Sequence, residues 1–91
     1  MEIPITKTAR KFGYIIWNSV NGVELERLLS SHERVRIILN GVDVGIKNID
    51  KRYRRISVGY KYTRSLHDEE NTYSISLGKD SLIVRTKNAE Q

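Results

Sequence analysis

The sequence predicts an all-β domain with short helices, in which two pseudo-symmetric strand–helix–hairpin repeats close into one six-stranded barrel. Three observations predict this fold. Several short runs alternate apolar with polar residues, turn-forming sequences separate these runs, and the segments of the first half recur in order in the second. The 91 residues are enough for one compact domain and too few for two. We therefore expect a single barrel domain over residues 1–91.

The first half opens with two predicted strands. Residues 3–8 form a short strand with Ile3 and Ile5 on one face, and residues 12–17 are rich in the aromatic and β-branched side chains that strands favour. Trp17 ends the second strand, and packing in the core is the default expectation for so large an apolar side chain.

A short helix is predicted over Val23–Leu29. Asn21 is the expected N-cap, with Glu24 three residues later in a loose form of the capping box. Leucines recur at helical spacing and mark the packed face: Leu25, Leu28 and Leu29. A helix of two turns depends on such packing more than on intrinsic propensity.

Asn40-Gly41 is the strongest hairpin signal in the chain, because both residue types tolerate the positive φ angles of a type I′ turn. It connects an alternating strand over residues 35–40 to a return strand. The apolar residues of both strands are expected to face the core: Val35, Ile37, Leu39, Val42, Val44 and Ile46. Asp43 and Lys47 are expected to face solvent.

The second half repeats these elements. We predict a strand over residues 55–60, one helical turn over 62–66, a polar loop over 67–71, a strand over Thr72–Leu77, a turn over 78–80 and a return strand over 82–86. Ile56 and Val58 share one face of the first of these strands. Tyr73, Ile75 and Leu77 alternate with serines and are expected to point inward.

The two halves align segment by segment. Leu39 corresponds to Leu77 at a separation of 38 residues, and Ile15 corresponds to Ile56 at 41. We predict repeat one over about residues 3–49, repeat two over about residues 53–87, and a frayed tail at residues 88–91. The alternative is that any two β-hairpins look this similar.

A lone strand–helix–hairpin unit has one apolar face and unpaired sheet edges. Closing two units around each other buries both faces and removes the edges, which is why we expect a barrel. Gly13, Gly45 and Gly59 stand within strand-like runs, where a tight barrel needs bends or bulges. Because both units lie in one chain, we expect a monomer.

Several segments carry a family resemblance. RISVGYKYTRSL and YSISLGKDSLIVRTK resemble the AbrB/SpoVT domain of bacterial transition-state regulators and antitoxins, and FGYIIW, ELERLL and VRIILNGVDVGIK look like a second, more divergent copy. Two such units in one chain are similar to the single-chain cradle-loop barrels of RIFT type, among them a small archaeal protein. The resemblance covers about residues 3–87 and implies a closed, six-stranded cradle-loop (RIFT-like) barrel.

The resemblance also implies DNA binding. By position, the arginines that contact DNA in the family correspond to Arg27, Arg55 and Arg64. The chain departs from the family pattern where Gly59 and Asn18 replace its proline, and where Tyr14 replaces the leading arginine of the first copy. Symmetric DNA contacts from both copies are therefore not implied.

The net charge of +5 is concentrated in residues 51–64, which we term the basic segment. This segment contains six basic residues and no acidic one: Lys51, Arg52, Arg54, Arg55, Lys61 and Arg64. The rest of the chain has ten basic and eleven acidic residues, so we expect a basic patch. Tyr53, Tyr60 and Tyr62 are interleaved with the cations, as suits phosphate neutralisation and base stacking.

The leading hypothesis is a nucleic-acid-binding, transcription-regulatory domain whose six basic residues contact DNA or RNA. If all six met phosphates, the logarithm of affinity for duplex DNA would fall with the logarithm of salt at a slope of about −5. The alternative for the segment is a solvated strand face whose tyrosines fill the barrel ends. The alternative functions are a small-ligand module for a nucleotide or flavin, by fold analogy, and a protein-interaction adaptor.

Other functions lack the residues that they need. The absence of cysteine excludes a disulfide scaffold, a thiolate metal site and a cysteine nucleophile. Ser19, Ser30 and Ser31 have no evident base, and the acids near His32 and His67 lack metal-ligand spacing. We therefore expect no enzymatic activity, metal or cofactor. No apolar run approaches about 18 residues and no apolar leader is visible, so we expect a soluble, cytoplasmic protein without membrane contact.

Overall fold

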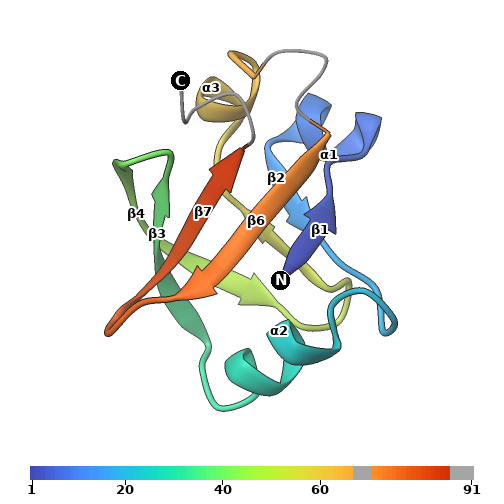
Figure 1. The fold of residues 1–91 in the computed structure, drawn as a ribbon, viewed down its shortest axis with the longest axis vertical. Helices are drawn as coiled ribbons and strands as arrows, with labels where there is room; N and C mark the ends of the chain where they lie inside the picture. The colour runs from blue at the N-terminus through green and yellow to red at the C-terminus, as the bar shows by residue number, and fades with distance from the viewer. Residues whose placement is uncertain (67–70, 87–91) are drawn as a thin grey trace.

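Residues 1–66 and 71–86, which the computed structural model describes, form one seven-stranded sheet that curls into a nearly closed barrel (Figure 1). The strands are β1 (Glu2–Pro4), β2 (Tyr14–Ile16), β3 (Arg34–Leu39), β4 (Val42–Asp50), β5 (Arg55–Ser57), β6 (Thr72–Leu77) and β7 (Ser81–Thr86). Their order in the sheet is β1-β6-β7-β3-β4-β5-β2. The mostly β prediction is confirmed. The predicted six strands and full closure are wrong, because β1 adds a seventh strand beside β6 and leaves β1 and β2 as the two ends of the sheet.

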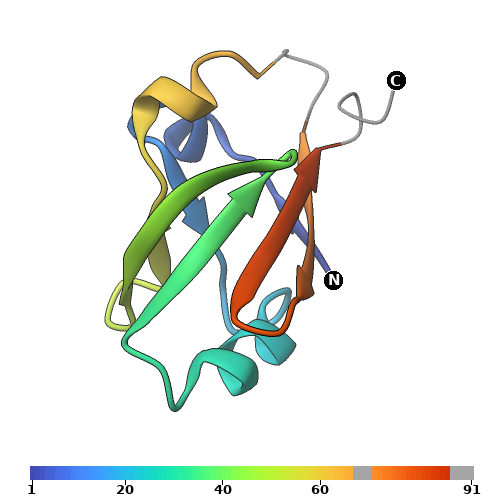
Figure 2. The same cartoon turned by 90° about the vertical axis from the view of Figure 1, so that its left-hand side faces the viewer.

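Three short helices lie within the described residues. They are α1 (Lys7–Phe12), α2 (Val23–Leu29) and α3 (Tyr60–Thr63). α2 lies at one end of the barrel, and α1 and α3 lie together at the other end (Figures 1 and 2). None of these helices has the length and apolar character that crossing a membrane requires.

The predicted strand over residues 3–8 is wrong beyond Pro4, where the chain turns into α1. The Thr6 side chain caps this helix by accepting a hydrogen bond from the backbone N–H of Ala9 (3.0 Å), and Gly13 ends it in the left-handed conformation with φ 78°. Ala9 is the one buried residue of α1, so the helix has no repeating apolar stripe. Its caps and its contact with α3 stabilise it instead.

β2 is shorter than the predicted strand over residues 12–17. Its central residue, Ile15, faces the core, and Trp17 just beyond it is buried as expected. A Cβ atom at Gly22 would lie 2.5–2.7 Å from the Trp17 side chain. The glycine therefore lets the chain before α2 close over the indole ring.

α2 has the predicted bounds and buries Leu25 and Leu29. Its predicted cap is wrong. Gly22 precedes the helix without a side-chain cap, while the Asn21 side-chain carbonyl accepts a hydrogen bond from the backbone N–H of Asn18 (3.0 Å). Asn21 thus stabilises the turn that leads into the helix, and packing of the leucines stabilises the helix itself.

The β3–β4 hairpin turns at Asn40 and Gly41 with φ angles of 50° and 83°, as predicted. β3 buries the three apolar residues predicted to face inward. In β4 the prediction holds for Val44 but is wrong for Val42 and Ile46, which are 53% and 57% exposed. A β-bulge makes Val44 an extra residue in the ladder, and the glycine after it has a φ of 97°. Strict alternation therefore does not run the length of β4.

β6 has the predicted bounds and buries Tyr73 and Ile75. Leu77 ends this strand and is 50% exposed, contrary to the prediction. It lies opposite the buried Leu82 of β7, so it shares the inner face but stands at the end of its strand, in the wall of a surface groove.

β5 keeps three residues of the predicted strand over 55–60, because α3 begins at Tyr60 rather than at residue 62. Ile56 and Val58 are both buried, as expected. Most of the predicted polar loop and all of the predicted tail lie outside the described residues.

The two halves of the chain meet where β2 pairs with β5. Ile15 lies opposite Ile56, the position to which the predicted repeats align it, and both side chains are 0% exposed. β3 pairs in parallel with β7, but the equivalent neighbour of β6 is β1 rather than β4. The order of helices and strands along the chain repeats in the two halves. The pairing of strands follows a two-fold pseudo-symmetry at β2 and β5 but not at β6.

Thr63 connects α3 to α1 in the interior. Its side chain is 0% exposed, and its hydroxyl donates to the backbone carbonyl of Arg10 (3.0 Å), with the carbonyl of Tyr60 as a second acceptor at 3.3 Å. Thr63→Val removes the donor and keeps the shape, so we expect the free energy of unfolding in urea to fall by about 1–3 kcal/mol. Thr8→Val, at an exposed position of α1, should change it by less than about 0.5 kcal/mol. Equal effects of the two substitutions would contradict this role of the hydroxyl.

Candidate nucleic-acid interface

The six residues of the basic segment do not form one patch. Lys51, Arg52 and Arg54 lie in the β4–β5 turn, Lys61 and Arg64 lie in and just after α3, and Arg55 lies in β5. The turn contacts α2, and α3 lies at the opposite end of the barrel (Figure 2). The predicted single patch is therefore divided between the two ends, with Arg55 between them.

Two of the six cations are engaged with α2. The Lys51 ammonium group donates to the backbone carbonyl of Ser30 (3.0 Å), the residue that ends the helix. The Arg54 guanidinium forms an ion pair with Glu26. These contacts hold the β4–β5 turn against α2, so both cations have a structural partner.

Asp50, at the end of β4, orients two further residues. Its carboxylate accepts a hydrogen bond from the Arg55 Nε atom (3.3 Å) and another from the backbone N–H of Tyr53 (3.1 Å). One acidic side chain thus sets both the turn that carries the tyrosine and the direction of the neighbouring guanidinium.

A row of three cations and three aromatic rings, which we term the cation–aromatic ladder, runs from α1 across β2 and β5 to the β4–β5 turn. Its members in spatial order are Lys11, Phe12, Tyr14, Arg55, Tyr53 and Arg52. Each cation lies 4.8–5.5 Å from the centroid of its neighbouring ring, and the centroids of the first two rings are 6.1 Å apart. The ladder joins the two ends of the barrel along its outer surface.

Strand pairing brings the middle of the ladder together. Ile15 and Ile56 face the core opposite each other, so the residues next to them in sequence, Tyr14 and Arg55, face outward. These two residues are diagonal neighbours in the antiparallel pair, within reach of long side chains. The guanidinium of Arg55 lies over the Tyr14 ring at 4.8 Å and over the Tyr53 ring at 5.0 Å.

The outer members of the ladder are open to solvent. Phe12 is 52% exposed and Tyr53 is 57% exposed, high values for aromatic side chains. Within the described part of the chain, the charged ends of Lys11 and Arg52 have no acidic partner within ion-pair distance. Both rings and both charges are thus available to a ligand.

A smaller cation–aromatic group lies on α3. Lys61 lies 5.0 Å from the centroid of the Tyr62 ring, and Arg64 lies 5.9 Å from that of Tyr60, which is 54% exposed. Since α3 contacts α1, this group adds positive charge near the end of the ladder that begins with Lys11.

Half of the ladder escaped the sequence prediction. Lys11, Phe12 and Tyr14 lie more than thirty residues before the basic segment in the sequence. The run KFGY combines a cation with two aromatic residues and could have signalled a site, but its apolar character predicted only a strand. The pairing of β2 with β5 is what brings it beside Arg55.

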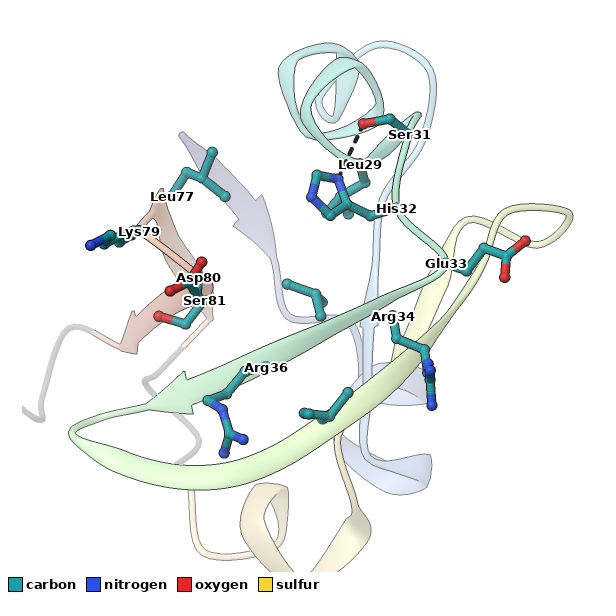
Figure 3. A pocket seen from close by; sticks show the side chains of 12 residues that line it. Leu29, Ser31, His32, Glu33, Arg34, Arg36, Leu77, Lys79, Asp80 and Ser81 are labelled. Atoms are coloured by element: carbon teal, nitrogen blue, oxygen red, sulfur yellow. Dashed lines mark hydrogen bonds between the residues drawn. The ribbon is translucent and has the colours of Figure 1, made fainter.

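A groove of about 1020 Å³ lies at another part of the surface, between the α2–β3 connection, β3, β4 and the β6–β7 turn (Figure 3). Lys79 and Asp80 lie across it from His32. Arg36, also in its wall, is paired with Asp43 at 2.7 Å. Its lining mixes both signs of charge and includes no phenylalanine, tyrosine or tryptophan. A smaller cavity of about 230 Å³ lies beside Trp17.

Within residues 1–66 and 71–86, no three histidine, aspartate or glutamate side chains gather as a ligand set. No family model, curated protein or solved structure matches this chain.

Proposed function

We propose that this domain binds nucleic acid through the cation–aromatic ladder. The observation that carries the proposal is the continuous row of three cations and three rings that runs from the end of α1 across β2 and β5 to the turn beside them. Cations neutralise phosphates and aromatic rings stack on bases, and proteins that bind nucleic acid without a base-specific code combine the two.

The basic segment has divided roles in this proposal. Arg52 and Arg55 belong to the ladder, and Lys61 and Arg64 extend the positive surface at the α1–α3 end. Lys51 and Arg54 hold the turn against α2 and lie outside the ladder.

We also propose a cradle-loop (RIFT-like) type for the barrel and a transcription-regulatory role for the domain, acting as a monomer without catalysis. The support is the resemblance to AbrB/SpoVT domains, the repeated order of elements, and the pairing of Ile15 with Ile56. Both units of the barrel come from one chain, so a second chain is not required to cover their apolar faces.

A nucleotide or flavin ligand has less support. The large groove offers no aromatic ring other than that of His32 for stacking, and its cations are accompanied by acidic side chains. The cavity beside Trp17, at about 230 Å³, lies below the range of about 300–1000 Å³ typical of ligand pockets. The ladder is therefore the better candidate.

Salt dependence tests the proposed function. If Lys11, Arg52 and Arg55 contact phosphates, a plot of the logarithm of affinity against the logarithm of salt should have a slope of about −2 for a labelled single strand and about −3 for a duplex. Lys11→Gln should reduce the magnitude of either slope by about 0.7–0.9. Lys79→Gln, in the β6–β7 turn, removes the same charge elsewhere and should leave the slope unchanged. If the salt dependence of the wild-type affinity, measured by fluorescence anisotropy, has a slope near zero, the proposal is wrong.

A further inference from the structure

We infer that the ladder is a track for single-stranded nucleic acid, in preference to a duplex; this inference rests on the proposed function and names the class of ligand. The inference is based on the exposure of the aromatic rings to solvent and not on the positive charge of the surface. A cationic surface alone attracts any polyanion, whereas exposed aromatic faces add affinity only for bases whose own faces are uncovered.

The rings at the two ends of the ladder are the stacking surfaces. Phe12, at the end of α1, and Tyr53, in the β4–β5 turn, are each more than half exposed (52% and 57%). In a duplex each base is already stacked on its neighbours, so rings outside the grooves meet only sugar and phosphate. In a single strand every base has a π-face that such rings can cover.

The arrangement of the ladder also suits a single strand. Its two exposed rings, Phe12 and Tyr53, do not stack on each other, because Tyr14 and the Arg55 guanidinium lie between them. The gap between Tyr14 and Tyr53 is filled by the Arg55 guanidinium, which Asp50 holds. Bases that stack on the outer rings are therefore kept apart, and Arg55 lies where the phosphate between them would pass.

The backbone that carries the rings is held in place before a ligand arrives. Gly13 fixes the turn between Phe12 and Tyr14, and the Asp50 carboxylate fixes the backbone of Tyr53. Because the backbone at these positions is set by the fold, ring stacking does not require the main chain to become ordered on binding, which favours affinity.

Fluorescence anisotropy with three labelled probes of about 12 nucleotides tests the inference: oligodeoxythymidine, oligouridine and a mixed-sequence DNA duplex. We expect at least one single strand to bind about tenfold more tightly than the duplex, and the two single strands distinguish DNA from RNA. Tyr53→Ala and Phe12→Ala should each weaken single-strand binding about tenfold and leave duplex binding within twofold. Tyr53→Phe should retain wild-type affinity, because it keeps the ring.

Leu77→Ala is the matched control, since Leu77 is a similarly exposed apolar side chain in the groove wall, outside the ladder and the α3 group, and it should bind like the wild type. Circular dichroism would establish that each variant is folded. Equal affinity for single strands and duplex, with no loss in Tyr53→Ala, would overturn the single-strand inference and leave the proposed function standing. Failure to bind any of the three probes would overturn both.

Discussion

Gly13→Ala should lower the free energy of unfolding by about 3–5 kcal/mol, measured by urea titration. Gly13 has a φ of 78°, and a Cβ atom there would lie 2.4 Å from the backbone nitrogen of Tyr60 and 2.5 Å from the carbonyl carbon of Gly59. These are backbone atoms, so no side-chain rotation can relieve the contact. The Gly13 carbonyl also accepts hydrogen bonds from the backbone N–H groups of Val58 (2.7 Å) and Gly59 (3.1 Å). The substitution therefore strains the junction between α1 and the start of α3.

Gly41→Ala separates the two causes of the loss expected for Gly13→Ala, which are the positive φ angle and the close approach of the backbone. Gly41 has a similar φ of 83°, but a Cβ atom there would meet nothing within 4 Å. It should cost only the backbone term of about 1–2 kcal/mol. The difference between the two variants measures the close approach of the chains, and equal losses would show that the packing at Gly13 is not as tight as the structure has it. Because Gly13 separates two rings of the ladder, Gly13→Ala should also weaken single-strand binding under conditions where it stays folded.

Ile56→Ala, like Ile15→Ala, should cost about 2–5 kcal/mol of unfolding free energy. The two side chains are 0% exposed and lie opposite each other where β2 pairs with β5, a strand pair that brings aligned positions of the two halves together. Removing either leaves a cavity at the centre of the barrel. Since they share that cavity, the double variant should be less destabilised than the sum of the two single variants, by about 0.5–3 kcal/mol.

Ile46→Ala provides the comparison for this cycle. It is the same substitution in a strand, at a side chain that is 57% exposed, and should change the unfolding free energy by less than about 1 kcal/mol. Additive losses in the Ile15 and Ile56 pair would show that β2 and β5 are stabilised independently, contrary to a barrel in which the two halves close on each other.

The candidate site was predictable in part. The concentration of positive charge in residues 51–64 is a property of the sequence and holds in any fold. The sequence does not determine which of these cations are available to a ligand, because that depends on the fold. Arg54 and Lys51 find their partners in α2 at separations of 28 and 21 residues, and only the folded chain brings them together. The same closure supplies Phe12 and Tyr14 to a ladder that the basic segment alone could not make.

The sequence by itself determined the elements whose conformation depends on residues close together in the chain. The bounds of α2 and β6 follow from periodicity over six or seven residues, and the Asn40-Gly41 turn follows from the φ angles that two residues tolerate. Tertiary structure decided α1, the bulge at Val44, the pairing of β1 with β6 as a seventh strand of the sheet, and the ladder. Each of these depends on contacts between residues far apart in the chain, such as the carbonyl of Gly13 with the N–H groups of Val58 and Gly59, which connect β5 to α3. Local sequence patterns do not predict those contacts. At such positions the choice between strand and helix depends on the free energy of long-range contacts, and these contacts form only when the barrel closes.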